Sequence, residues 1–188
     1  VIKFYRSRSY SPIWNAEEVR KTFSEELAKA DEEGLSTENY YTPKLQELLS
    51  YEEELPLEDR IASEVLLTDS FFRYAEDLFY GKVDPKDLYS LWGLKREELD
   101  PAKILTNIST AEDISSALDS LKPQHPIYKG LKKSLQEYKA MKEKDSIVVQ
   151  IGKGKPIKRG DQDVRLPQIA KRLQQLELIR LDTLKNDS

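Results

Sequence analysis

The sequence predicts a mainly α-helical protein, with an irregular multi-helix bundle over residues 1–144 and a small β-hairpin-plus-helix module over residues 145–188. Apolar residues recur at helical spacing through most of the first part, and proline and glycine mark where the helices begin and end. Residues 147–151 then form a β-branched run that glycine and proline follow, which is typical of a short hairpin. We therefore place a domain boundary near Lys144.

The first helix of the bundle is expected after an extended, aromatic-rich entry over residues 1–15. Asn15, with Glu18 three residues later, has the spacing of a capping pair. Apolar residues at helical spacing follow, and Gly34 is the expected end of this helical stretch.

The strongest helical pattern covers residues 57–80 and ends before Gly81. One face is predicted to carry Ile61, Val65, Thr68, Phe72, Ala75 and Phe79, widened by Leu67, Phe71 and Leu78. We expect Thr68 to pack inward and Asp69 to hold a neighbouring helix or loop by hydrogen bonds.

Three polar-proline pairs predict further helix starts, because proline suits the first turn, where its missing amide is not needed. The pairs are Thr42-Pro43, Asp84-Pro85 and Asp100-Pro101. Ser109 with Glu112 resembles another capping box, which predicts a further helix after it. Pro123 is expected to end this helix.

A last helix of the bundle begins at Pro126 and places Tyr128, Leu131, Leu135 and Tyr138 on one face. Trp14 and Trp92 are expected to pack in the core, since a large aromatic side chain gains most from burial.

Composition limits the compartment and the partners only weakly. The net charge of −4 combines 14 basic and 26 acidic residues in 1–120 with 16 basic and 8 acidic residues in 121–188. Such a split indicates either a partner-facing end or a self-complementary fold. No apolar run approaches the roughly 20 residues that span a bilayer. The chain opens at Val1 without a signal-like segment, and we expect any targeting segment to have been removed.

The residues offer no catalytic set, and neither a cofactor nor a metal is expected. The sequence has no cysteine and a single histidine, His125, whose position at a helix start is typical of a capping or surface residue. The acidic residues around Asp161 and Asp163 span too few positions for a calcium loop. A basic cluster near Lys158 lacks interleaved aromatics, and the sequence pI of about 5.3 also argues against a nucleic-acid module.

The order of several short stretches resembles one family, the large bacterial L,D-transpeptidases. The stretches that resemble their scaffold domain are Phe4-Tyr5, Trp14, Leu66 to Asp69, Gly81 to Pro85, Trp92, Pro123, His125-Pro126 and Tyr128. Ile151, Gly154, Gly160-Asp161, Asp163 and Arg165 resemble the start of the peptidoglycan-binding-like module that follows. Two features depart from the family pattern: Ile147 to Val149 replace a common tryptophan, and no glycine follows Leu176.

The resemblance implies a non-catalytic scaffold that positions a catalytic domain in the bacterial periplasm, with peptidoglycan and that domain as partners. In the family, a Ser-x-Gly-Cys motif carries the thiol that attacks a tetrapeptide stem and releases D-alanine; this motif is absent here. The residues that the resemblance offers for substrate binding are Lys158, Arg159, Asp161, Asp163 and Arg165. Structural roles are expected for Trp14, Asp69, Gly81, Trp92, Pro123 and Tyr128. A stand-alone helical module that binds a protein partner remains the alternative.

Overall fold

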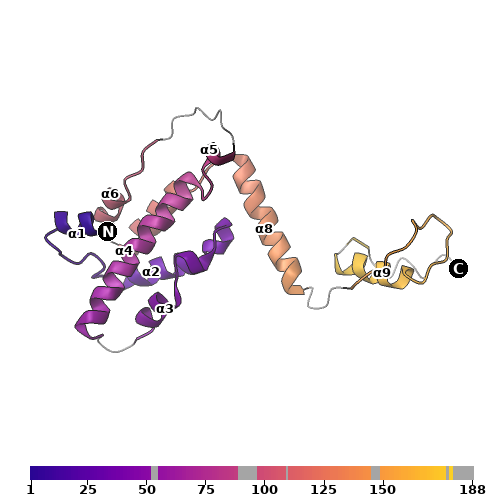
Figure 1. Ribbon diagram of the computed structural model, residues 1–188, viewed down its shortest axis with the longest axis horizontal. Coiled ribbons are helices and arrows are strands. Elements are labelled where there is room, and N and C mark those ends of the chain that lie inside the picture. Colours follow the sequence, from indigo (N-terminus) through magenta and orange to yellow (C-terminus); the bar gives the residue numbers. More distant parts are fainter. Residues whose placement is uncertain (52–54, 89–96, 109, 145–148, 177, 180–188) are drawn as a thin grey trace. The chain divides into compact units, whose positions relative to one another are not determined.

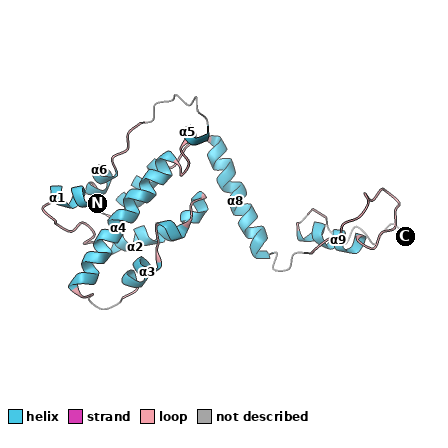
Figure 2. Cartoon of the chain, viewed as in Figure 1, coloured by secondary structure: helices cyan, strands magenta, loops and turns pink. Residues whose placement is uncertain are grey.

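A computed structural model describes the chain except for residues 52–54, 89–96, 109, 145–148, 177 and 180–188. The described part is mainly helical and contains no strand (Figures 1 and 2). The chain divides into two compact units, residues 1–132 and residues 133–188.

The first unit is built from short helices around one long helix. Its elements are α1 (Ile2–Ser7), α2 (Glu17–Ala28), η1 (Ala30–Glu33), η2 (Thr37–Asn39), α3 (Pro43–Leu49), α4 (Leu57–Tyr80), α5 (Pro85–Leu88), α6 (Pro101–Thr106), α7 (Ala111–Leu121) and the first residues of α8 (Pro126–Lys144). Helix α4 packs against α3, α6 and α7, while α7 also packs along α2.

Helix α4 has the predicted bounds, and most of its predicted apolar face is buried, namely Leu67, Thr68, Phe71, Ala75 and Leu78. Tyr74, which was not predicted for this face, is buried as well. Ile61 and Val65 of the predicted stripe are instead 56% and 41% exposed. Apolar side chains occur on more than one side of this helix, so periodicity alone could not fix the limits of the face that α3, α6 and α7 cover.

The core is rich in aromatic contacts. The Trp14 ring stacks on Phe23 with centroids 5.0 Å apart and an interplanar angle of 16°. Phe71 of α4 lies edge-on to Trp14 at 6.3 Å. Burial of such large side chains is the main favourable term in a domain of this size.

The expected extended entry is wrong for residues 2–7, which form α1. This helix buries Phe4 and Tyr5 together, and the Phe4 ring meets Phe72 of α4 edge-on at 5.4 Å. Ser9 and Tyr10 then adopt left-handed backbone angles, with φ of 52° and 61°. The chain reverses there, which the aromatic composition of the segment did not indicate.

All three polar-proline helix starts are found as predicted, at Pro43, Pro85 and Pro101. Thr42 Oγ1 accepts a hydrogen bond from the Leu45 amide at 3.3 Å, and Asp100 Oδ1 accepts one from the Lys103 amide at 3.0 Å. Each side chain satisfies an amide that the first helical turn leaves without a partner.

Two predicted caps require correction. The N-cap of α2 is Ala16, whose side chain makes no cap, and the Asn15 amide group donates to Pro12 O instead. The capping box of α7 is formed by Thr110 and Asp113, one residue later than expected. Neighbouring Ser, Thr, Asp and Glu residues allow either register, and packing of α7 against α2 and α4 selects one.

The second unit holds the rest of α8 and α9 (Leu166–Gln175). The predicted hairpin does not form among the described residues: residues 149–165 are loop and turn. Gly154, Pro156 and Gly160 interrupt the segment that would have to supply the second strand. Ile147 and Val148 of the predicted first strand lie outside the described residues. Among the described helices, none is both long and apolar enough to cross a membrane.

Candidate functional site

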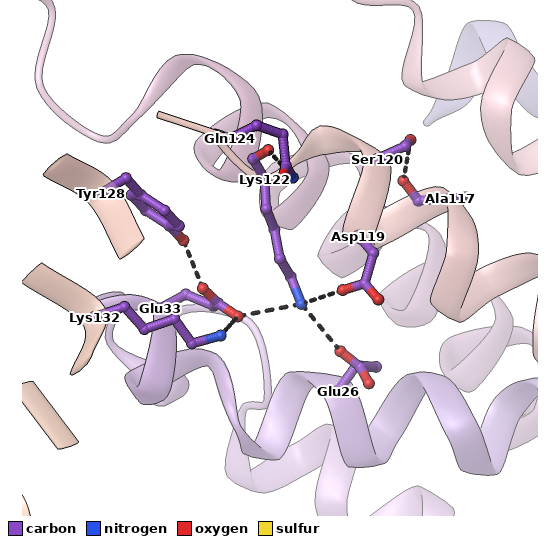
Figure 3. Close-up of polar contacts among 9 residues, drawn as sticks. All are labelled: Glu26, Glu33, Ala117, Asp119, Ser120, Lys122, Gln124, Tyr128 and Lys132. Atoms are coloured by element: carbon purple, nitrogen blue, oxygen red, sulfur yellow. Dashed lines mark hydrogen bonds and ion pairs between the residues drawn. The ribbon is translucent and has the colours of Figure 1, made fainter. Parts of the chain in front are cut away.

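A buried carboxylate, Glu33, connects segments that are far apart in the sequence (Figure 3). It is the last residue of η1, and Gly34 follows in the left-handed conformation with φ of +77°. Its carboxylate accepts hydrogen bonds from Tyr128 Oη at 2.5 Å and from Lys132 Nζ at 2.6 Å. Its side chain is only 4% exposed. Glu33 therefore attaches the first two turns of α8 to η1.

Lys122, just beyond α7, brings a second cation to this cluster. Its ammonium lies 3.1 Å from Glu33 Oε1, 2.7 Å from Asp119 Oδ1 and 3.9 Å from Glu26 Oε2. Lys122 thus connects the end of α7 both to η1 and to α2. We refer to Glu26, Glu33, Asp119, Lys122, Tyr128 and Lys132 as the Glu33 cluster.

The electrostatics of the cluster favour the ionised pairs. Burial alone would raise the pKa of Glu33, but hydrogen bonds from Lys132, Tyr128 and Lys122 hold it below its usual value. Burial opposes the charge of Lys122, yet Asp119 and Glu33 raise the pKa of that ammonium above its usual value. Burial raises the pKa of Tyr128, and the Glu33 carboxylate adds to this effect. A carboxylate held by three donors is a poor general base, so the geometry indicates a structural connection.

A second group of hydrogen-bonded side chains connects the N-terminal segment to α4. Tyr5 Oη lies 2.8 Å from Glu64 Oε1 and 2.6 Å from Thr68 Oγ1, while Trp14 Nε1 donates to Thr68 Oγ1 at 2.9 Å. Every group is satisfied if Trp14 donates to Thr68, Thr68 to Tyr5 and Tyr5 to Glu64. Glu64 also accepts the Ile13 amide at 2.6 Å.

A third connection fixes η2 on α4. Tyr40 Oη donates to Asp77 Oδ2 at 2.5 Å, and Ser70 Oγ donates to Tyr40 O at 2.7 Å. Asp69, which we expected to hold a neighbouring segment, instead pairs with Arg73 of its own helix at 3.2 Å. It is Arg73 that reaches the neighbour, donating to Asn39 O at 2.7 Å.

The residues suggested for substrate binding lie in the second unit and form two local pairs. The Lys158 amide donates to Asp161 Oδ2 at 2.8 Å. Arg165 donates to Asp163 through Nε and Nη2, at 2.9 and 2.8 Å. These hydrogen bonds lower the pKa of Asp163 to about 2.

Asp163 and Arg165 therefore use much of their hydrogen-bonding capacity on each other. Arg165 Nη2 also donates to Lys155 O at 2.7 Å, which holds the loop. Lys158 and Arg159 are exposed.

The other singled-out residues have positions that the fold explains. Trp14 is buried, Gly81 ends α4 with φ of +75°, and Pro123 lies between α7 and α8. His125 Nδ1 accepts the Ile127 amide at 3.2 Å, at the start of α8. Trp92 lies outside the described residues. Within the described part, no group of acidic or histidine side chains could hold a metal ion.

Sequence reasoning missed Glu33, Lys122, Lys132 and Glu64, which are central to these connections. Glu33 meets Tyr128 and Lys132 across 95 and 99 residues of sequence. No local pattern distinguishes it from Glu32 beside it. The one signal in the sequence was Gly34, whose left-handed conformation ends η1 directly after Glu33.

The fold and these buried connections define a class: a helical domain whose buried polar groups join its own segments. Residues 1–135 match the family model described as Scaffold domain, and the chain belongs to that family. Comparisons with curated proteins and with solved structures give no match.

Proposed function

We propose that this chain is the scaffold of an L,D-transpeptidase-like cell-wall cross-linking protein, which positions a catalytic domain in the bacterial periplasm. The observation that carries the proposal is membership of the Scaffold domain family over residues 1–135. The resemblance of the sequence to the scaffold of large L,D-transpeptidases supplies the parent activity. A domain that positions another must resist deformation, and the Glu33 cluster and the Tyr5–Glu64 connection supply cross-links between distant segments.

The first test concerns the chemistry of the chain itself. Acyl transfer of this kind requires a thiolate, and the sequence contains no cysteine. We expect the purified chain to release no D-alanine from tetrapeptide stems. Release that persists after repurification, and that is lost when the chain is removed by antibody, would contradict the proposal.

The second test concerns the gene. We expect the coding sequence beyond Ser188 to encode a Ser-x-Gly-Cys motif with an upstream histidine, and the whole polypeptide to release D-alanine from tetrapeptides. Loosening the scaffold through Glu33→Gln should then lower cross-linking more than Glu25→Gln, which removes an exposed charge from α2. A stop codon directly after Ser188 would contradict the proposal.

A binding role for the second unit rests on the exposed pair Lys158 and Arg159 rather than on Asp163 and Arg165. If this loop meets peptidoglycan, Lys158→Ala with Arg159→Ala should weaken co-sedimentation with purified sacculi. The matched change Lys171→Ala with Arg172→Ala, on α9, removes the same charge. Equal weakening by both pairs would indicate general charge attraction and no site.

The alternative, a helical module that binds a protein partner, is favoured by one observation. Leu57, Ile61 and Val65 form an exposed aliphatic row on α4, 63%, 56% and 41% exposed. Such a row is a common anchor for a partner helix. Under this alternative, Ile61→Ser with Val65→Ser would remove a protein partner, and the gene would show no transpeptidase motif.

A further inference from the structure

Helix α8 carries an apolar row that is exposed along most of its length. Ile127, Leu131 and Tyr138 are 67%, 66% and 70% exposed, and Met141 is 39% exposed. At 100° per residue, Ile127, Leu131 and Tyr138 fall within about 40° of one another around the helix. The row runs the length of a helix of 19 residues, about 28 Å long.

The same helix is strongly basic. Its sequence contains six lysines and two glutamates. Lys129, Lys133 and Lys142 are exposed. Lys142 is adjacent to the apolar row, where its aliphatic stem can lie along apolar groups while its ammonium reaches outward.

The Glu33 cluster explains why Ile127 and Leu131 do not face η1. Tyr128 and Lys132 stand on a neighbouring side of the helix and are held by Glu33, at 2.5 and 2.6 Å. That attachment fixes which side of the first two turns meets η1. Ile127 and Leu131 are left in solvent as a consequence.

We propose that α8 is an interfacial helix that binds the surface of an anionic phospholipid bilayer. Charge complementarity selects this occupant, because a helix with six lysines, two glutamates and one exposed apolar row suits anionic headgroups above an acyl boundary. A bilayer also accepts a single amphipathic face without a shaped groove. The inference is independent of the proposed transpeptidase role.

The test measures co-sedimentation of the full chain with vesicles. We expect binding to phosphatidylcholine vesicles that contain phosphatidylglycerol, weakening with salt, and little binding to phosphatidylcholine alone. Ile127→Ser with Leu131→Ser should reduce the partition coefficient by more than about tenfold. Lys142→Gln, which removes the charge beside the row, should reduce it by about fivefold.

The matched control is Leu57→Ser with Ile61→Ser on α4, where two aliphatic side chains of similar exposure stand beside acidic residues. This variant should bind vesicles as the wild type does. Circular dichroism should show all variants folded, because each changed side chain is exposed.

Four results of the vesicle test would overturn the proposal, and so would one result on oligomeric state. The four are no binding by the wild type, equal binding to both vesicle types, full binding by the Ile127→Ser/Leu131→Ser variant, and equal loss in the α4 control. Full binding by that apolar variant would mean that charge alone attracts the chain to anions. If sedimentation velocity shows a wild-type dimer that the same variant converts to monomer, the row joins two copies and the lipid proposal is wrong.

Discussion

Single buried polar groups hold this domain together across long sequence separations. Glu33 and Glu64 each gather donors from segments that no local pattern connects. Removing one partner of a buried ion pair leaves the other charged group without compensation, and this costs more than the pair contributes. Substitutions of these single residues should therefore have the largest and most specific effects on the stability of the domain.

Glu33→Gln tests the first of these groups. The change keeps the shape but removes the charge that faces Lys122 and Lys132, so we expect a loss of about 3 kcal/mol in unfolding free energy at neutral pH. The pKa of Glu33 is lowered in the folded state. Its contribution is therefore present above the unfolded pKa of about 4.3 and is lost as pH falls through the folded pKa.

Denaturant unfolding at neutral and at acidic pH measures this contribution. Glu25→Gln, an exposed change on α2, is the control and should be near neutral in effect. A wild-type advantage over Glu33→Gln that stays constant into strong acid would contradict the ionised pairing.

Thr68→Val tests the second group with little change of volume. Without the hydroxyl, the buried Trp14 Nε1–H loses its acceptor, and we expect a loss of about 1–3 kcal/mol. Thr68→Ser keeps the hydroxyl and should retain most of that energy despite its smaller side chain. Thermal unfolding of the two variants compares them directly; equal stability would mean that packing of the methyl group, not the hydrogen bond, is what matters.

At the scale of elements, helix positions were more predictable than helix faces. The bounds of α4 follow from its apolar pattern and from Gly81, and the starts of α3 and α6 follow from proline and side-chain caps. Which side of α4 is buried depends on α3, which precedes it in the sequence, and on α6 and α7, which follow it at a distance. The Glu33 cluster was unpredictable for the same reason, although Tyr128 itself could be singled out.

A pair of truncations on α4 checks the buried face. Leu67 is fully buried, so Leu67→Ala should cost about 2–5 kcal/mol. Ile61 belongs to the predicted stripe but is 56% exposed, and Ile61→Ala should cost no more than about 0.5 kcal/mol. Chemical denaturation of both variants gives the comparison, and a larger loss for Ile61→Ala would restore the stripe predicted from sequence.

At the scale of the whole molecule, buried phenols are distributed among several elements. Tyr5 lies on α1, Tyr74 on α4 and Tyr128 on α8, while Tyr40 ends η2. Burial raises the pKa of each above its usual value. Nearby carboxylates add to the effect, Asp77 at Tyr40 and Glu33 at Tyr128. Ionising any of them should therefore oppose folding of the unit as a whole.

The resulting prediction is a cooperative alkaline unfolding. A raised folded pKa means that each phenol's contribution is fully present below the unfolded pKa of about 10 and is lost as pH rises from there toward the folded pKa. Each such phenol should lower stability by up to about 1.4 kcal/mol per pH unit in that window. Lys122, whose pKa is also raised, acts in the same direction.

Phenolate absorbance and far-ultraviolet circular dichroism should show a step of ionisation that coincides with loss of helicity. Tyr74→Phe should shrink that step and make the loss of stability with pH less steep. If the step is unchanged in Tyr74→Phe, or if it precedes any loss of helicity, these phenols ionise within the folded protein and their burial does not govern its alkaline stability.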